Sequence, residues 1–387
     1  MNVKSNNSLN LKLAILAAGL VFFLILTGCG KAKKGDKAPE IAGLSFEKKL
    51  DLSYAKTFKV YRYEGGFDLV HIDEVGDYLI VPEGKKAPSD LDKEIIALNK
   101  PLRNIYLQAT SAMALINDIG AMENLKFSGT NVEGWQIQPP IDALNRGDLI
   151  FAGKYSAPDY ELLVDEKCNL AIESTMIYHT PEVKEKLEEL GINVLVEKSS
   201  YEAHPLGRFE WIKLYGILFD KEEEAERSFE EQLEIVNKVK DNENTGKTVA
   251  YFYINSHGGV VTRKSNDYVS KMIKMAGGNY IFDDLSDDTK LSTINMTIEE
   301  FYASAKDVDI LIYNSSIMEE VHSIDELINL SPVLTDFKAV KNGNCWCTGK
   351  NLFQETNSIG GIIKDMHKIF NAGAGDATEL DYFTKIK

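Results

Sequence analysis

The stretch KEEEAERSFEEQLEIVNKVKD, residues 221–241, decides the fold because it separates two runs of alternating strands and helices. Its apolar residues recur every three or four positions, which is the spacing of one helix face. Glutamates crowd its start and lysines its end, an arrangement that suits the helix dipole. At about 1.5 Å per residue, the pattern predicts one helix of roughly 30 Å.

Both regions that flank this helix have the pattern of α/β units. Before it, short apolar stretches such as LKFSGT (125–130) and CNLAIEST (168–175) alternate with helical segments. After it, TVAYFYIN (248–255) and VDILIYNSS (308–316) do the same. Strands that alternate with helices indicate a parallel sheet covered on both faces. We therefore predict an α/β fold of two lobes, each with a central, mainly parallel sheet flanked by helices, joined by one long α-helix.

Turn signals refine this plan at both ends of the chain. Alternating runs around Gly65-Gly66 and a turn at Gly76-Asp77 predict extra β-hairpins at the start of the first lobe. Near the other end, AVKNGNCWCTG (339–349) predicts a hairpin around Asn342-Gly343. The predicted segments are a signal peptide (1–28), a flexible tether (29–52), an N-terminal lobe (53–215), the linking helix (216–245) and a C-terminal lobe (246–387).

Composition limits the class of partner. The 387 residues contain 43 Lys and Arg against 59 Asp and Glu, which gives a net charge of −16. This excess of acid argues against a nucleic-acid partner, because affinity for phosphate backbones comes mostly from Lys and Arg. Only four cysteines are present, too few for a disulfide scaffold.

The N-terminus predicts where the protein is located. Lys4 and Lys12 precede the uncharged stretch 13–26, which is too short to span about 30 Å of hydrocarbon comfortably but suits a signal peptide. Leu26-Thr27-Gly28-Cys29 follows and resembles the lipobox of bacterial lipoproteins, in which the cysteine is acylated and begins the mature chain. We expect a protein anchored through lipid on Cys29 at the extracytoplasmic face of the membrane. The alternative is a plain membrane anchor with an incidental cysteine.

No stretch of the sequence matches a catalytic motif. It contains no H-E-x-x-H, no G-x-S-x-G and no complete phosphate-binding loop, and its six histidines lack metal-ligand spacing. We therefore predict no catalytic residues, no cofactor and no built-in metal site. Cys345 and Cys347 would share one face of a strand, so a soft-metal pair, two free thiols and a bridge to Cys168 all stay open.

The most distinctive segment is SSYEAHPLGRFEW (199–211), which follows a strand directly and opens a helix. Loops at the carboxyl ends of parallel strands line the ligand crevice of open α/β sheets. Tyr201 offers an aromatic wall and Glu202 an acid. His204 adds a titratable ligand, and Arg208 adds a fixed cation suited to bidentate capture of a carboxylate or another oxyanion.

Polar residues at other strand ends of both halves are predicted to join the same ligand-binding cleft. For these residues the alternative is an ordinary solvated turn, and for Arg208 it is an ion pair with Glu210 beside a core Trp211. The further candidates are Thr110, Ser111, Thr130, Trp135, Lys154, Tyr155, Glu173, Ser174, Asn255, Ser256, His257 and Asn314.

Together these features resemble a known family. The lipobox, the two α/β halves, the linking helix and the stretches SSYEAHPLGRFEWIKLYGILFDKEEEAE (199–226) and TSAMALINDIGA (110–121) are similar to substrate-binding lipoproteins of ABC importers. The class is the one that handles iron–siderophore complexes, haem and vitamin B12, and the resemblance covers roughly residue 38 to the end. It implies a small-molecule ligand held between lobes that move little relative to one another.

The resemblance also implies an ABC permease as partner. In this class one acidic residue of each lobe docks onto arginines of the permease, and these positions fall on Glu161 and on Glu300 or its neighbour Glu299. The alternative is a pair of solvent-facing glutamates that stabilise the first turns of their helices through the helix dipole.

The function predicted from the sequence is therefore binding without bond chemistry. We expect a monomer, tethered to the membrane, that captures an iron chelate, haem or a corrinoid in the cleft and delivers it to the permease. The alternative is an exported two-lobe enzyme or a cell-surface adhesion lipoprotein, since fold alone does not fix function. Glu202 and His204 are the only local candidates for an acid/base pair in that alternative.

Overall fold

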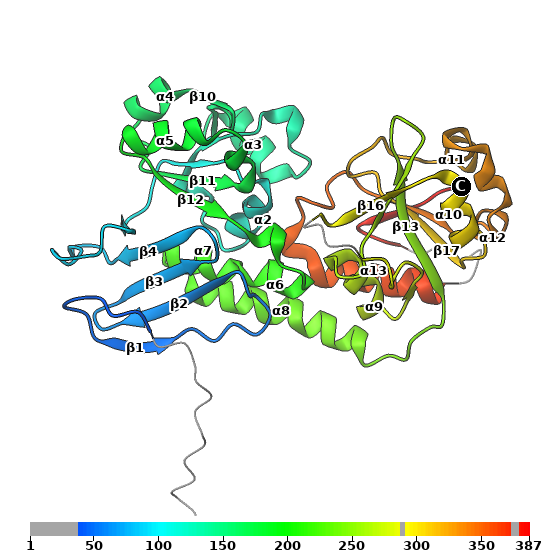
Figure 1. Cartoon of the computed structure of the whole chain (residues 1–387), viewed down its shortest axis with the longest axis horizontal. Coiled ribbons are helices and arrows are strands. Elements are labelled where there is room, and N and C mark those ends of the chain that lie inside the picture. Colours follow the sequence, from blue (N-terminus) through cyan, green and yellow to red (C-terminus); the bar gives the residue numbers. More distant parts are fainter. Residues whose placement is uncertain (1–37, 287–290, 373–378) are drawn as a thin grey trace, which may run out of the picture. The chain divides into compact units, whose positions relative to one another are not determined.

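The computed structural model describes residues 38–286, 291–372 and 379–387 (Figure 1). The predicted signal peptide, Cys29 and most of the tether lie outside the described residues. Within the described part, the strands form three sheets of five, five and seven strands and one two-stranded ribbon. Of the helices in these ranges, none combines the length and the apolar character that a membrane span requires.

The first sheet contains the predicted hairpins and has the strand order β1-β2-β3-β4-β5. Strands β1 to β4 pair antiparallel, and β5 pairs parallel with β4. One face packs into the main core through residues such as Phe58, Val70 and Ile80. The strands are β1 (Phe46–Lys49), β2 (Phe58–Tyr63), β3 (Phe67–Ile72), β4 (Gly76–Val81) and β5 (Ile95–Asn99).

The structured region begins earlier than the predicted end of the tether at residue 52. Ile41 is buried, and β1 pairs with β2 from Phe46 onward. All four residues of β1, FEKK, are exposed. A charged strand at a sheet edge has no apolar period, so its composition does not distinguish it from a tether.

The second sheet is parallel throughout and has the order β12-β11-β6-β7-β8. Tyr106, Ala171 and Val194 pack with residues of α4 and α5, whereas the next residue of each strand faces the main core. Both faces are thus buried, as in other parallel sheets. The strands are β6 (Ile105–Leu107), β7 (Leu125–Ser128), β8 (Ile150–Phe151), β11 (Leu170–Ser174) and β12 (Asn193–Glu197), with the ribbon β9 (Gly153–Lys154) and β10 (Ala157–Pro158). The helices are α2 (Thr110–Asp118), α3 (Gln138–Arg146), α4 (Tyr160–Asp165), α5 (Pro181–Glu189), α6 (Pro205–Glu210) and α7 (Ile212–Phe219).

The third sheet belongs to the C-terminal lobe and is mixed. Strand β13 pairs parallel with β15 and β17, and β17 pairs parallel with β18, whereas β14, β16 and β19 join antiparallel. The strands are β13 (Thr248–Ile254), β14 (Val260–Arg263), β15 (Asn279–Tyr280), β16 (Thr293–Met296), β17 (Ile310–Tyr313), β18 (Cys345–Thr348) and β19 (Phe383–Lys385). The helices are α9 (Tyr268–Met275), α10 (Ile298–Ala305), α11 (Ile324–Leu330), α12 (Lys338–Lys341) and α13 (Ile359–Asn371).

The hairpin predicted around Asn342-Gly343 is wrong. This dipeptide instead ends α12 and leads into β18, with Gly343 at φ 64° and the Asn344 N–H bonded to the Ala339 carbonyl at 2.8 Å. Helix ends and tight hairpins both favour glycine because both need a residue with positive φ. The same sequence signal therefore fits either structure.

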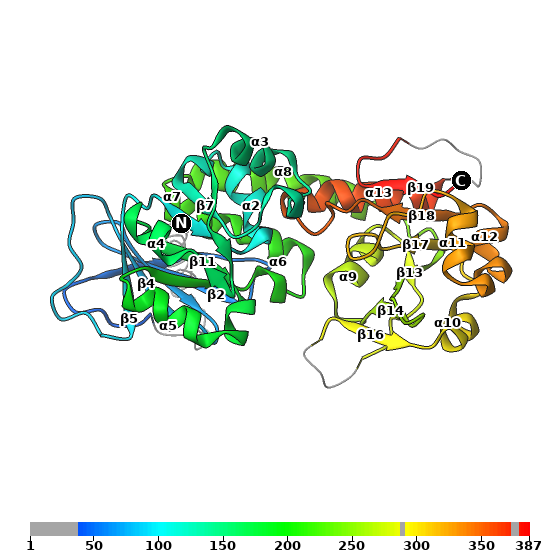
Figure 2. The ribbon, with the colours of Figure 1, turned by 90° about the horizontal axis from the view of Figure 1, so that it is seen from above.

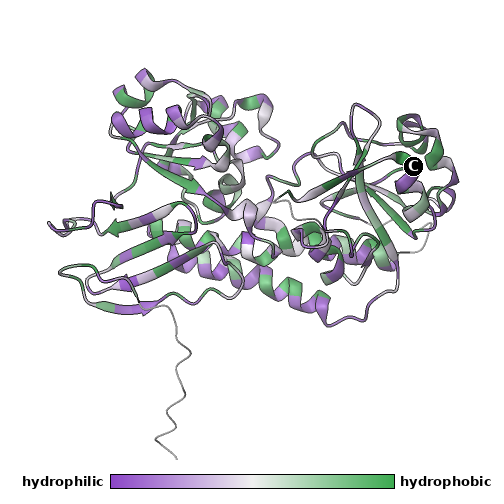
Figure 3. Cartoon of the chain, viewed as in Figure 1, coloured by the Kyte–Doolittle hydropathy of each residue, from purple (hydrophilic) through white to green (hydrophobic). Residues whose placement is uncertain are grey.

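The linking helix α8 (Glu222–Lys240) lies within the quoted stretch 221–241 and is shorter than the predicted segment 216–245. Residues 216–219 belong to α7, and Asp220 adopts a left-handed conformation with φ 57° between the two helices. Figure 3 shows α8 banded in purple and green, and the apolar residues that it buries include Phe229 and Val236.

Helix α8 packs against α7 of the first lobe and α13 of the second (Figure 1, Figure 2). Both contacts are close because they involve glycine. A Cβ atom on Gly216 of α7 would lie 2.8 Å from the Ala225 Cβ, and one on Gly360 of α13 would lie 2.9 Å from the Gln232 carbonyl oxygen. The Gly360 N–H also donates to the Gln232 side-chain oxygen at 2.8 Å. The two-lobe α/β architecture joined by one long helix is thus confirmed.

Candidate functional site

A cavity of about 460 Å³ is lined by residues of both lobes. In the first lobe they come from the carboxyl ends of β6, β11 and β12 and from the helices that follow, the position at which open α/β sheets bind ligands. The second lobe contributes the ends of β13 and β14, the start of α9 and the chain between β18 and α13. The lining residues of the first lobe are Gln108, Thr110, Ser111, Ser174, Ser200 and Arg208.

Arg208 places a cation at this cavity. Its Nε donates to the Glu202 carbonyl at 3.1 Å, and its Nη2 donates to the Ser200 carbonyl. The guanidinium carbon lies 3.6 Å from the ring centroid of Tyr268, which belongs to the second lobe. The alternative ion pair with Glu210 is not formed, because the Glu210 carboxylate binds the backbone N–H groups of Ser53, Tyr54 and Ala55.

Arg263 places a second cation at the cavity, from the other lobe. The residue is only 6% exposed, and its guanidinium lies 5.2 Å from the ring centroid of Phe353. Its Nη1 donates a long hydrogen bond of 3.4 Å to Ser292 Oγ, and Asp267 Oδ2 is 3.9 Å away, beyond hydrogen-bond distance. Arg263 is not among the residues predicted from the sequence, because the four-residue strand β14 that ends at it was not predicted.

The chain between β18 and α13 closes the cavity on one side by binding the first lobe. The side-chain amide of Gln354 donates to the Gly134 carbonyl at 3.0 Å and accepts from the Gln136 N–H at 2.8 Å. Thr356 Oγ1 donates to the Ser111 carbonyl at 2.6 Å. In the sequence, the only indication of this contact between the lobes is that the segment after the buried strand β18 is polar.

Four of the predicted ligand-binding residues, namely Thr110, Ser111, Ser174 and Arg208, line the cavity. Their contact with a ligand stays a prediction. In the same segment as Arg208, Tyr201 is 52% exposed, and its hydroxyl lies 3.2 Å from Thr175 Oγ1.

Glu202 and His204 have internal partners in place of a ligand. The Glu202 carboxylate is buried and accepts hydrogen bonds from the backbone N–H groups of Lys56 and Thr57 at 2.8 Å. His204 caps α6 by accepting the Leu206 N–H at Nδ1, and its ring stacks on Tyr54 with centroids 4.7 Å apart. Burial lowers the pKa of the His204 imidazole to about 4. Neither residue belongs to the cavity lining found among the described residues.

Trp135 and Thr130 also contact each other rather than the cavity. Trp135 is buried, and its Nε1 donates to the Thr130 carbonyl at 3.1 Å and to Ser128 Oγ at 3.2 Å. The indole donor is thereby satisfied within the lobe, as is usual for a core tryptophan.

Other predicted residues lie in turns, and the cavity lining found among the described residues does not include them. Lys154 ends β9 and is followed by Tyr155 in the turn of the small ribbon. Asn255, Ser256 and His257 form the turn between β13 and β14, where Asn255 Oδ1 accepts the backbone N–H of His257 at 3.0 Å. Here the alternative of an ordinary turn describes the structure.

Glu173 and Asn314 are buried at strand ends with unsatisfied polar atoms. Neither carboxylate oxygen of Glu173 has a hydrogen-bond partner in the described part of the chain, and burial raises the pKa of this carboxyl to about 8. The carbonyl of Ile172, the residue before Glu173, accepts the N–H of Gln108 at 2.9 Å, and Gln108 lines the cavity. Asn314 Oδ1 accepts the Ser316 N–H at 3.2 Å, while its Nδ2 has no partner among the described residues.

The residues implied for permease docking lie in the first turns of exposed helices. Glu161 is exposed at the start of α4. Glu300 is exposed at the start of α10, but its Oε2 accepts the Thr297 N–H at 2.7 Å in a capping box. Its neighbour Glu299 is exposed in the same turn. Glu300 thus has a structural role of its own.

Cys168, Cys345 and Cys347 are free and buried. Burial raises the pKa of the Cys168 thiol to about 11 and that of the Cys345 thiol to about 12. Thiolates, not thiols, bind metals, so the soft-metal alternative has no support here. Groups of three or more metal-ligating side chains are not found in residues 38–286, 291–372 and 379–387.

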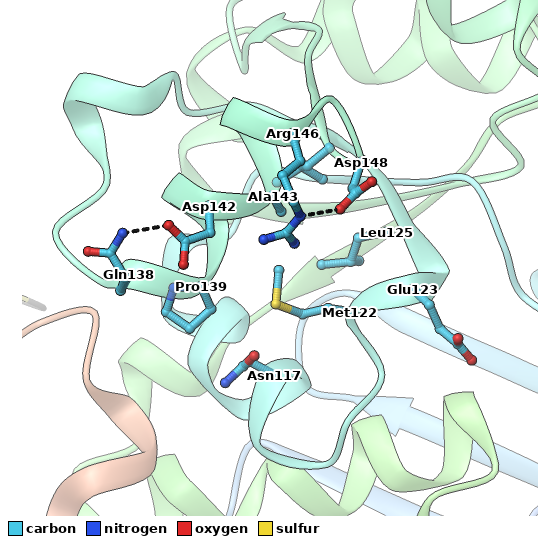
Figure 4. A pocket seen from close by; sticks show the side chains of 11 residues that line it. Asn117, Met122, Glu123, Leu125, Gln138, Pro139, Asp142, Ala143, Arg146 and Asp148 are labelled. Carbon is cyan, nitrogen blue, oxygen red and sulfur yellow. Dashed lines mark hydrogen bonds and ion pairs between the residues drawn. The ribbon is translucent and has the colours of Figure 1, made fainter.

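A second hollow, of about 700 Å³, lies within the first lobe between the end of α2 and α3 (Figure 4). Four of its polar side chains pair with one another. Gln138 Nε2 donates to Asp142 at 2.7 Å, and Arg146 Nε donates to Asp148 at 2.7 Å. The Arg146 side chain is also 62% exposed, so this hollow offers no desolvated charge for a ligand.

Comparison with known proteins identifies the family of this two-lobe chain. Residues 130–352, more than half of the chain, match the model of the periplasmic binding protein family. The chain is a member of the periplasmic binding protein family. The first sheet, β1 to β5, lies before the matched residues.

Similar proteins include two lipoproteins of Methanocaldococcus jannaschii. One is 28% identical over 372 residues, 86% of this chain and 85% of the relative, and the other is 26% identical over 346 residues, 86% of each. Among solved structures, the periplasmic haem-binding protein HutB of Vibrio cholerae has a TM-score of 0.55 at 17% identity, covering 68% of this binding protein and 99% of that chain. The catecholate-siderophore binding protein VctP of Vibrio cholerae has a TM-score of 0.54 at 15% identity, covering 69% and 93%. These structures share the fold.

The buried Glu173 makes a prediction about stability. Its pKa rises from 4.5 to about 8 on folding, so between these pH values the unfolded chain releases a proton that the folded chain keeps. Stability of the wild type should therefore fall as the pH rises, by about 1.4 kcal/mol per pH unit. The Glu173→Gln variant cannot ionise at this position. Its free energy of unfolding relative to that of the wild type should therefore rise by about 1.4 kcal/mol per pH unit. Urea unfolding from pH 5 to pH 8 measures the difference.

The Glu185→Gln variant provides the matched control, because Glu185 is an exposed carboxylate of the same lobe. Parallel pH profiles for wild type and Glu173→Gln would show that Glu173 is not the buried neutral acid described above.

Proposed function

We propose that this periplasmic binding protein serves an ABC importer and captures an anionic iron chelate, siderophore-like, or a related metal chelate. One observation carries the proposal: two guanidinium groups, one from each lobe, line the same cavity. A ligand with negative charge at two points can bridge them and thereby hold the lobes together. HutB and VctP, which share the fold, are named for haem and for a catecholate siderophore.

The state of Arg263 supports an anionic ligand. A buried cation loses hydration, and this cost is offset only by a partner of opposite charge and by hydrogen bonds. Asp267 pairs with Arg263 at 3.9 Å, an ion pair beyond hydrogen-bond distance, and Ser292 accepts one long bond. Since a guanidinium has five N–H donors, most of its hydrogen-bonding capacity has no partner among the described residues and can serve a ligand. The bidentate geometry of arginine suits carboxylate and catecholate oxygens.

Aromatic side chains narrow the ligand class further. Tyr268 and Phe353 stack against the two guanidinium groups, and Tyr253 also lines the cavity. Aromatic walls favour flat conjugated groups through offset stacking. A catecholate chelate or a porphyrin with carboxylates fits this combination of aromatic and cationic groups better than a sugar or a hydrated ion.

Delivery to a permease requires that the protein stays near the membrane and docks. We propose a lipid anchor on Cys29, supported by the relatives that are named lipoproteins. Docking through Glu161 and the pair Glu299 and Glu300 is proposed from the first-turn positions of these residues on exposed helices. Because the Glu300 carboxylate caps α10, Glu299 is the better candidate for contact with a partner.

The ligand proposal is tested by binding to the purified protein. We expect a ferric tris-catecholate or haemin to bind more tightly than cyanocobalamin or a neutral hydroxamate complex. Arg208→Ala and Arg263→Ala should each weaken binding of the anionic chelate at least tenfold, about 1.4 kcal/mol or more. Calorimetric titration measures both effects. Arg146→Ala is the control, since this exposed arginine lies at the other hollow. Equal affinities of wild type and both cavity variants would contradict the proposal.

The delivery proposal is tested by uptake of the same labelled chelate into cells. The Glu161→Arg/Glu299→Arg double variant should bind the chelate normally but transport almost none, because reversed charge repels arginines of the permease. Cys29→Ser should leave the membrane fraction. Full transport by the double variant would exclude this docking mode, and membrane retention of Cys29→Ser would exclude the lipid anchor.

A further inference from the structure

We propose that Glu202 is a positioning residue for ligand capture: its buried carboxylate anchors the loop that holds Arg208 at the cavity. This inference rests on the proposed function in one respect only, namely that Arg208 contacts the ligand. It assigns to a residue outside the cavity, and to the sheet formed by β1 to β5, a part in binding.

The side chain of Glu202 binds the segment that leads into β2. Its Oε1 accepts the N–H groups of Lys56 and Thr57 at 2.8 Å and the Thr57 hydroxyl at 2.5 Å. Trp211 Nε1 is 3.4 Å from the same oxygen. The residue is 3% exposed. Hydrogen bonds to a carboxylate are stronger than those between neutral groups, so this cluster fixes Glu202 against the first sheet.

The backbone of the same residue holds Arg208. The Glu202 carbonyl accepts Arg208 Nε at 3.1 Å, and the Ser200 carbonyl, two residues earlier, accepts Nη2. These two bonds fix the plane of the guanidinium above the Tyr268 ring. Since arginine has five N–H donors, others remain for a ligand. The direction of the Glu202 carbonyl therefore sets the position of the Arg208 charge.

Close packing holds α6, which carries Arg208, against the segment before β2 that Glu202 binds. Gly207 lies in α6 between the loop and the anchored segment. A Cβ atom on Gly207 would lie 3.0 Å from the Tyr54 carbonyl oxygen and 3.2 Å from Glu202 Oε2. Glycine at this position lets α6, Glu202 and the segment before β2 approach one another, and little space remains for the loop to shift while the Glu202 bonds persist.

Glu210 offers a matched control on the same helix. It is fully buried, and its carboxylate accepts the N–H groups of Ser53, Tyr54 and Ala55 at 2.8 to 3.0 Å. It thus anchors the same chain segment with a similar set of bonds, but neither its side chain nor its carbonyl contacts the Arg208 guanidinium in the described structure. Loss of Glu210 should cost stability alone, whereas loss of Glu202 should also displace Arg208.

The test is a double-mutant cycle with a ferric tris-catecholate as the probe. Glu202→Gln should weaken binding at least tenfold in the wild-type background and less than twofold in the Arg208→Ala background, since both changes then remove the same contact. Glu210→Gln should lower the thermal midpoint of unfolding about as much as Glu202→Gln does, but it should leave the affinity for the probe unchanged. Equal losses for Glu202→Gln in both backgrounds, or an equal loss for Glu210→Gln, would overturn the proposal.

A second readout needs no ligand and separates this inference from the proposed function. The exchange rate of the Arg208 Nε–H with solvent, measured by ¹⁵N NMR, should rise at least tenfold in Glu202→Gln and stay unchanged in Glu210→Gln. An unchanged rate in Glu202→Gln would overturn the positioning role even if the probe binds. Failure of every anionic probe to bind the wild type would overturn the proposed function, while a raised exchange rate would still support the positioning role.

Discussion

The close packing of α8 between α7 and α13 is the constraint on which the rest of the structure depends. Gly216 and Gly360 bring two helices, one of each lobe, into near contact with the linking helix. A side chain at either position would push its helix away by overlap with Ala225 or with the Gln232 backbone. Because protein interiors are densely packed and deform little, this arrangement fixes the distance between the sheet of one lobe and the sheet of the other. The cavity lies between the two lobes, where both contribute lining residues.

Electrostatics inside the cavity oppose those of the whole chain. The protein carries a net charge of −16, yet each lobe places one guanidinium group at the cavity, that of Arg208 from the first lobe and that of Arg263 from the second. Of the nearby carboxylates, Glu202 and Glu210 bind backbone N–H groups, and burial raises the pKa of Glu173 to about 8. Glu355 lines the cavity itself, and its carboxylate accepts hydrogen bonds from Asn351 and Ser358. The charged residues of the described lining are thus two guanidinium groups and one carboxylate, a positive balance that suits an anionic ligand.

Much of the fold could be predicted from the sequence, because periodicity reports directly on burial. The linking helix differs by one residue at each end from the stretch quoted first. Ser174 at the end of β11 and Ser111 at the start of α2, after β6, do line the cavity. Arg263 was missed because its strand is short and antiparallel, so that neither length nor alternation marked it. The Asn342-Gly343 turn was misassigned because positive φ serves both helix ends and hairpins.

The direction of a side chain could not be predicted in the same way. Glu202, before α6, and Arg208, within α6, are close in sequence and have the chemistry expected of ligand-binding groups, but only Arg208 lines the cavity. What decides between them is the backbone at residues 56 and 57, far away in the sequence, which supplies hydrogen bonds to Glu202. Such long-range partners leave no local signal.

The distance between the lobes tests the central claim most directly. Spin labels at the exposed positions 185 of α5 and 325 of α11 report this distance by pulsed electron paramagnetic resonance. A linking helix packed against both lobes predicts one narrow distribution, which should shift by no more than about 1–2 Å when a ferric tris-catecholate saturates the protein, as expected of packed helices. A broad or two-peaked distribution, or a shift several times larger, as in hinge closure, would contradict the account.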